Sequence, residues 1–175
     1  MEYEFTIIAD GLDPQDEGFE GLFYDAGCDD ALVSFQKGHI LVDFAREAAS
    51  LEEAIGSAVM QVLSTGAKIE RVEPDPLVSM ADIASRSAMT RAAITNYFKG
   101  HRGEDFPAPV ARVTTASPLW DWSDVSIWLY HHGRVAREVA VEATVFTVAN
   151  SLLESANDNF PESLHQQVAQ RVAAI

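Results

Sequence analysis

Polar side chains between Arg91 and Lys99 have the types and the spacing of groups that contact the edges of nucleic-acid bases. On a helix with about 100° between residues, Arg91, Ala92, Thr95, Asn96 and Lys99 fall within about 140° of one another. An arginine donates to guanine O6 and N7, an asparagine pairs with adenine N6 and N7, and a threonine meets a thymine methyl group. This face is therefore a candidate surface for reading the major groove of DNA.

The other face of the same helix is apolar and carries Ala93, Ile94, Tyr97 and Phe98. A helix with one apolar and one polar side packs the first on a core and keeps the second for solvent or a partner. The pattern also fits an ordinary helical hairpin with a solvated face, so this helix alone leaves both interpretations open.

A second helix must hold the polar one in place, and the sequence predicts it directly upstream. Ser79 is a good N-cap and Asp82 follows three residues later, which predicts a helix over residues 80–86. The turn follows at residues 88–89, and Thr90 caps the helix that carries the polar face.

The segment after these two helices predicts a small hairpin and a third helix. A turn at residues 101–103 comes first, and Ser123 is the predicted cap of the last helix. We expect the three tryptophans of this segment to form a small apolar core. The predicted elements are strands over residues 110–113 and 119–122, joined by residues 114–117, and a helix over residues 124–130.

Five short motifs in this region carry a family resemblance: Ile83-Ala84, Thr90-Arg91, Phe106-Pro107-Ala108-Pro109-Val110, Trp120 or Trp122, and Ser123-Asp124-Val125. With these motifs in this order, residues 76–130 resemble the winged helix-turn-helix of AlpA-type and excisionase-type regulators, which is related to the MerR fold. Two features depart from the family. The turn carries Ala88 where glycine is common, which a negative φ would allow, and residues 114–117 of the wing include no arginine or lysine.

The resemblance implies binding to double-stranded DNA through the second helix, the turn after it and the wing. The implied contacts are Thr90, Arg91, Ala92, Thr95, Asn96, Lys99, His101, Arg102, Arg112, Thr114 and Thr115. No cofactor or metal is expected for such binding. The chain has no serine, histidine and aspartate at a recognisable catalytic spacing and no glycine-rich phosphate loop, so we expect no catalytic residues and no enzyme.

The net charge of −15 argues against a protein that is coated with nucleic acid, but its distribution is uneven. Residues 1–74 contain 16 acids and 4 bases, residues 75–116 contain 4 acids and 5 bases, and residues 117–175 contain 7 acids and 3 bases. The candidate DNA-binding region is therefore the one part of the sequence that is not acidic.

Residues 1–74 predict an α+β domain of the ferredoxin-like type, because strands and helices follow in the order βαββαβ. A capping box at Ser50–Glu53 begins the second helix, and Lys37-Gly38 forms a two-residue turn between two strands. Pro74 and Pro76 prevent a helix and mark the domain boundary. The predicted strands cover residues 3–9, 31–36, 39–44 and 68–72, and the helices begin at Phe19 and Leu51.

Residues 131–175 predict a C-terminal helical pair after the winged helix-turn-helix domain of residues 75–130. The first helix, over residues 134–154, has two apolar stripes and is the expected surface of a homodimer, and Pro161 begins the terminal helix. No segment approaches the roughly 18 apolar residues of a membrane span. The acidic N-terminus and the single cysteine, Cys28, fit a cytoplasmic protein without a membrane partner.

These features favour a dimeric repressor that reads the major groove with helix 91–99. One alternative is a protein-interaction module or an antitoxin-type adaptor. Another is a regulator whose N-terminal domain binds a small ligand, because its outline is similar to ACT-type sensing domains. Residues 37–44 partly match an RNA-recognition strand, but His39 and Leu41 replace the aromatic residues on which bases stack.

Overall fold

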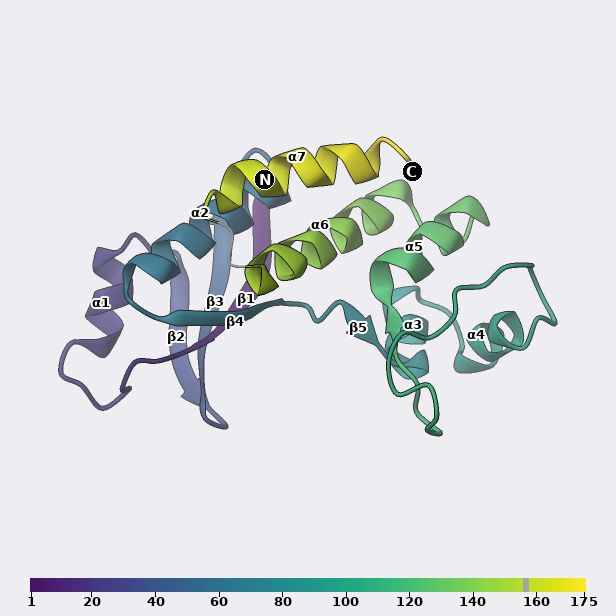
Figure 1. Ribbon diagram of the computed structural model, residues 1–175, viewed down its shortest axis with the longest axis horizontal. Helices are drawn as coiled ribbons and strands as arrows, with labels where there is room; N and C mark the ends of the chain where they lie inside the picture. Colours follow the sequence, from purple (N-terminus) through teal and green to yellow (C-terminus); the bar gives the residue numbers. More distant parts are fainter. Residues whose placement is uncertain (156–157) are drawn as a thin grey trace. The chain divides into compact units, whose positions relative to one another are not determined.

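The computed structural model describes residues 1–155 and 158–175 and shows an α+β protein (Figure 1). Its strands are antiparallel and contain two to nine residues. Across the described residues, no helix combines the length and the apolar character needed to cross a membrane.

The chain divides into two compact units. Unit 1 contains residues 1–74 and 148–170, and unit 2 contains residues 75–147 and 171–175. The first boundary lies between Pro74 and Asp75, in the proline-containing linker. The predicted third segment, residues 131–175, differs from the prediction because it contributes to both units.

Unit 1 is built on a four-stranded antiparallel sheet with the strand order β2-β3-β1-β4. Each of its two crossover helices connects strands that lie on either side of a third strand, so the elements follow the βαββαβ order. The bounds are β1 (Glu2–Asp10), α1 (Phe19–Asp25), β2 (Ala31–Gln36), β3 (His39–Glu47), α2 (Leu51–Ser64) and β4 (Lys68–Glu73).

One face of this sheet forms the core of unit 1. Phe5 lies opposite Phe44 and Ile7 lies opposite Val42 in the register of β1 and β3, and all four side chains are buried. The rings of Phe5 and Phe44 stack with their centroids 5.2 Å apart. Because residues directly opposite each other on antiparallel strands share a face, this row forms one continuous apolar surface.

Local sequence signals set the ends of these elements. The Ser50 hydroxyl accepts a hydrogen bond from the Glu53 N–H at 3.3 Å and so caps α2 as predicted. The Glu53 carboxylate accepts from the Ala49 N–H, so the reciprocal half of the predicted capping box is displaced by one residue. Lys37 (φ 51°) and Gly38 (φ 85°) form the predicted turn between β2 and β3.

Unit 2 combines a short helix pair, a small antiparallel sheet and a third helix. Strand β5 pairs with β6, and a bridge between Ala111 and Leu119 adds a hairpin next to them. The bounds are β5 (Leu77–Val78), α3 (Met80–Arg86), α4 (Arg91–Phe98), β6 (Trp120–Asp121) and α5 (Trp122–His131). Two further helices, α6 (Arg137–Glu154) and α7 (Phe160–Val172), contain residues of both units.

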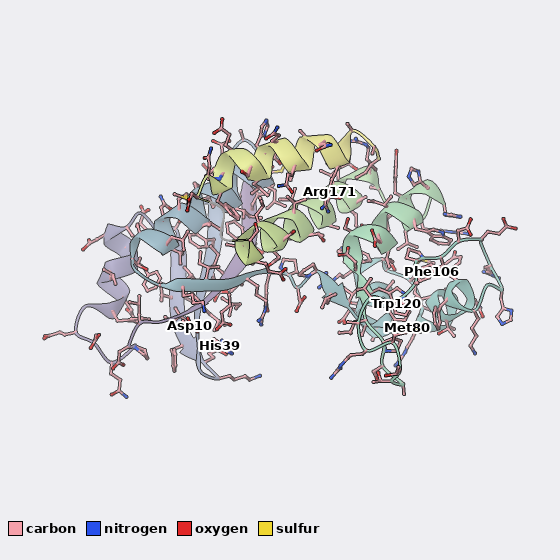
Figure 2. The ribbon with its side chains drawn as sticks, in the orientation of Figure 1. Asp10, His39, Met80, Phe106, Trp120 and Arg171 are labelled. Carbon is pink, nitrogen blue, oxygen red and sulfur yellow. The ribbon has the colours of Figure 1, made fainter. Side chains whose placement is uncertain are left out.

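The core of unit 2 is formed by its tryptophans, as predicted. Trp120, Trp122 and Trp128 are buried together with residues of α3, α4 and α5. Met80 and Phe106, labelled with Trp120 in Figure 2, pack against this cluster. The tryptophans therefore stabilise the unit and do not offer exposed rings for stacking on bases.

Two predictions for the hairpin region are wrong. The predicted strand over residues 110–113 is reduced to the bridge at Ala111. Trp122 lies in α5, whose N-cap is Asp121 and not Ser123, because the Asp121 carboxylate accepts from the N–H groups of Ser123 (2.8 Å) and Asp124 (3.2 Å). Burial raises the pKa of the Asp121 carboxyl.

Much of the two apolar stripes of α6 is buried within the single chain. Val145, Val148, Ala149 and Leu152 are all less than 4% exposed. Val139, Val141 and Leu153 of the same stripes are half-buried, so the homodimer surface expected on this helix stays a prediction.

Candidate nucleic-acid interface

Helix α4 presents a polar face because its opposite face is fixed in the core of unit 2. Ile94 (0% exposed) and Tyr97 (4% exposed) are buried in the tryptophan cluster. The Tyr97 ring meets the Trp128 ring edge to face with their centroids 5.0 Å apart. The Thr90 hydroxyl accepts from the Ala93 N–H at 3.2 Å, which fixes where the helix begins.

Four of the predicted contacts remain on the outer side of α4. Arg91, Ala92 and Lys99 are exposed, and Asn96 is half-buried. The structure thus brings together an arginine, an amide and a lysine with a small residue beside them. This set can donate to guanine, pair with adenine and approach a phosphate.

The hydroxyl of Thr95 is used inside the protein. It lies 2.9 Å from the Arg91 carbonyl oxygen and 3.0 Å from the sulfur of Met80 in α3. Since a hydroxyl has one proton, its donor is used within the protein. Thr95 therefore supports the contact between α3 and α4, and its methyl group is what remains for a partner.

The turn between α3 and α4 contains a residue with positive φ. Ala88 has a φ of 53°, so it does not adopt the negative φ that would accommodate alanine without strain. The Met89 N–H donates to the Ala84 carbonyl at 2.9 Å, and the Ala88 N–H donates to Ser85 at 3.3 Å. These bonds close α3 in the manner of a Schellman motif, for which glycine is the usual residue at the left-handed position.

His101 and Arg102 lie at the end of α4, where the chain turns back onto it. Both of their N–H groups donate to the carbonyl oxygen of Asn96, at 2.9 and 3.3 Å. Both residues are exposed, but so are Glu104 and Asp105 in the same loop. Residues 101–105 thus contain one arginine and two acids, so the loop adds less attraction for phosphate than Arg102 alone would.

The hairpin loop carries the last three predicted contacts. Arg112, Thr114 and Thr115 are exposed, and the Thr115 hydroxyl donates to the Arg112 carbonyl at 2.8 Å. In Figure 1 this loop projects from unit 2 separately from the loop that follows α4. Arg112 itself has a φ of 52°, a conformation that glycine or asparagine adopts more easily.

An aromatic contact connects α4 to the base of this hairpin. The Phe98 ring meets the Trp120 ring of β6 edge to face, with their centroids 5.2 Å apart. The Trp120 indole N–H donates to the Pro107 carbonyl at 3.0 Å and so holds the loop that leads into the hairpin. The helix face and the hairpin are thus parts of one packed unit.

The cations of this surface are not neutralised by internal partners. Within residues 1–155 and 158–175, no ion pair involves Arg91, Lys99, Arg102 or Arg112. The nearby Asp82 carboxylate is used in the cap of α3, where the Ser79 hydroxyl donates to it and lowers the pKa of Asp82. The four side chains are therefore available to an anionic partner.

Comparison of the chain with protein-family models, with curated proteins and with solved structures finds no match.

The charge of the two units is strongly asymmetric. Unit 2 contains eight arginine or lysine residues and eight aspartate or glutamate residues, so its formal charge is zero. Unit 1 contains four such bases and nineteen acids, so it carries the whole charge of −15. Any polyanion that approaches this protein is repelled by unit 1 and meets free cations on unit 2.

Proposed function

We propose that this protein is a sequence-specific DNA-binding regulator of transcription that reads the major groove with α4. The observation that carries the proposal is the outer face of α4. This face presents Arg91, Asn96 and Lys99 without internal ion pairs, while Ile94 and Tyr97 are buried behind it. A short helix held in this way, after a second short helix and a turn, is the arrangement with which helix-turn-helix proteins enter the groove.

The order of elements in unit 2 supports a winged form of this motif. The helix pair is followed by the hairpin with its bridge at Ala111 and Leu119 and by α5. This order is in keeping with the AlpA-type and excisionase-type resemblance of residues 76–130. In unit 1, the βαββαβ order and the strand order β2-β3-β1-β4 support a ferredoxin-like domain.

Arg112 supports a contact between the hairpin and the DNA backbone. A residue other than glycine at positive φ costs about 1 kcal/mol, and such strain is concentrated at functional sites. Arg112 is exposed and has a φ of 52°. Among the described residues it makes no ion pair that would offset the cost of this conformation. A phosphate contact gives a reason for arginine at this position.

The number of free cations predicts how the protein binds. With about four phosphate contacts, the logarithm of affinity falls with the logarithm of salt concentration with a slope of about −4. Such a monomer binds weakly, and the acidic unit 1 weakens non-specific binding further. Binding as a homodimer to an inverted repeat doubles the contacts, which suits a repressor of its operator.

Replacement of single side chains of α4 tests this proposal. Arg91→Ala and Asn96→Ala remove the two side chains that are able to pair with bases. Arg134→Ala is a matched control, because Arg134 is an exposed arginine of unit 2 outside the proposed interface. Reduced binding of a selected DNA site by the first two variants, with unchanged binding by the third, is the expected result.

A further inference from the structure

The two edge strands of the sheet in unit 1 differ in whether side chains bond to their outward backbone groups. Strand β4 forms one edge, and the side-chain amide of Asn150 bonds to both backbone groups of Val72 there. Strand β2 forms the other edge. No side chain in the described ranges bonds to the backbone of β2 residues 32–36, so this edge is open to a further strand.

The register of β2 shows which backbone groups face outward. Gln36 lies opposite His39 across the two-residue turn, which makes this pair a hydrogen-bonded one. Hydrogen-bonded positions alternate along an antiparallel pair. Val33 and Phe35 therefore direct their N–H and carbonyl groups away from β3 and toward the open edge.

A groove lies at the start of this edge, between β2 and the helix α1. A cavity of about 270 Å³ is lined by Glu20, Gly21 and Tyr24 of α1 and by residues 31–33 of β2. Two large side chains of this lining are exposed: Tyr24 is 66% exposed and Leu32 is 70% exposed. A groove between an edge strand and a helix is the setting in which domains bind extended peptides by strand addition.

The charge around the groove selects among possible occupants. Glu20 lines the groove, and unit 1 as a whole has nineteen acids and four bases. A second copy of unit 1 would bring the same negative charge to the edge, which disfavours pairing of β2 with itself. A basic segment is attracted by the same negative charge, and it can form the same backbone hydrogen bonds with β2.

We propose that the groove between α1 and β2 binds an extended, basic segment of a partner protein, which adds to the sheet as a strand next to β2. The outward N–H and carbonyl groups of Val33 and Phe35 pair with the segment. Its apolar side chains contact Tyr24 and Leu32, and its cationic side chains lie near Glu20. This binding uses unit 1 alone and is independent of DNA binding by unit 2.

The test uses the full-length chain and a synthetic peptide that alternates lysine and valine. Affinity is measured by fluorescence anisotropy, and the bound residues are located by amide chemical shifts. Val33→Pro removes an outward N–H without breaking the pairing with β3, and Val33→Ala keeps this N–H as the matched control. Glu20→Lys reverses the charge at the groove, and Glu4→Lys makes the same change at an exposed position of β1.

The proposal predicts shifts concentrated in residues 31–36 and a loss of affinity of about tenfold or more for Val33→Pro and Glu20→Lys, which corresponds to about 1.4 kcal/mol. The two controls, Val33→Ala and Glu4→Lys, should change the affinity by less than about threefold. Absence of peptide binding to the wild type overturns the proposal. So does equal binding of an alternating glutamate and valine peptide, or a self-associated species in sedimentation measurements that Val33→Pro abolishes and Val33→Ala does not.

Discussion

Asn150 and Val72 are joined by a pair of hydrogen bonds although 78 residues separate them in the chain. The Val72 N–H donates to the Asn150 side-chain oxygen at 2.9 Å, and the Asn150 amide nitrogen donates to the Val72 carbonyl at 2.9 Å. Val72 is fully buried, so both backbone groups would otherwise lie at a dry strand edge. This pair explains why the end of α6 belongs to unit 1 and not to a separate C-terminal domain.

Asn150→Ala should therefore destabilise unit 1 by about 2 kcal/mol or more, because it leaves a buried donor and a buried acceptor without partners. Asn150→Asp keeps an acceptor, and its carboxyl regains a donor when it is protonated, so the destabilisation should be smaller at a pH where this carboxyl is protonated. Urea unfolding followed by far-UV circular dichroism measures both. An unchanged unfolding midpoint for Asn150→Ala would show that water replaces the side chain at this edge.

Two residues at positive φ provide a matched pair of glycine variants, of which only one should change DNA binding. Ala88 (φ 53°) and Arg112 (φ 52°) both adopt a conformation that glycine adopts without strain. Ala88→Gly and Arg112→Gly should each stabilise the folded protein or leave its stability unchanged, by up to about 1 kcal/mol in thermal unfolding.

Only the second of these variants should affect DNA binding. Arg112→Gly removes a proposed phosphate contact, so affinity should fall and the salt slope should decrease in magnitude by about 1. Ala88→Gly changes the turn without removing a charge and should bind as the wild type does. Anisotropy titrations at several salt concentrations measure both slopes, and equal slopes for all three proteins would remove Arg112 from the interface.

Acid should weaken unit 1 through the contact between Asp30 and Arg46. Arg46 is buried and donates from Nε (2.7 Å) and from a terminal nitrogen (2.8 Å) to the Asp30 carboxylate. The hydrogen bond from Arg46 lowers the pKa of Asp30 below its ordinary value. An aspartate with a lowered pKa stabilises the fold above about pH 4 and loses this contribution as the pH falls through its folded pKa.

Asp30→Ala should therefore destabilise unit 1 by about 3 kcal/mol at pH 7, since it leaves a buried guanidinium without its counter-ion. The difference from the wild type should shrink as the pH is lowered below about 4. Asp29→Ala, at the exposed neighbouring position, is the control and should be nearly neutral. A difference between Asp30→Ala and wild type that stays constant from pH 7 to pH 3 would contradict this account of the ion pair.

Signals that act within a few residues were readable from the sequence. The β2 strand begins and ends at the predicted residues, and the caps at Ser50 and Ser79 lie where the sequence places them. The prediction of Ser123 as the cap of α5 is wrong because Asp121, two residues earlier, is an equally good cap and begins the helix sooner. Ser123 is instead buried, with its hydroxyl 3.5 Å from that of Thr144.

Features that depend on distant parts of the chain were not readable in this way. Nothing near Asn150 in the sequence indicates that it closes the edge of β4. A helical wheel places Thr95 on the polar face, but the crossing of α3 turns its hydroxyl toward Met80. The apolar stripes of α6 predicted burial correctly, yet periodicity does not distinguish burial within a chain from burial between two chains.

Selection of genomic DNA fragments by the full-length protein, followed by sequencing and affinity measurement, tests the central proposal most directly. The wild type should enrich fragments that share one inverted-repeat sequence. Arg91→Ala and Asn96→Ala should each weaken binding to that sequence by about 1–3 kcal/mol, while Arg134→Ala should not. Enrichment of no common sequence, or binding of the two α4 variants as tight as that of the wild type, would contradict the assignment of α4 as the helix that reads DNA.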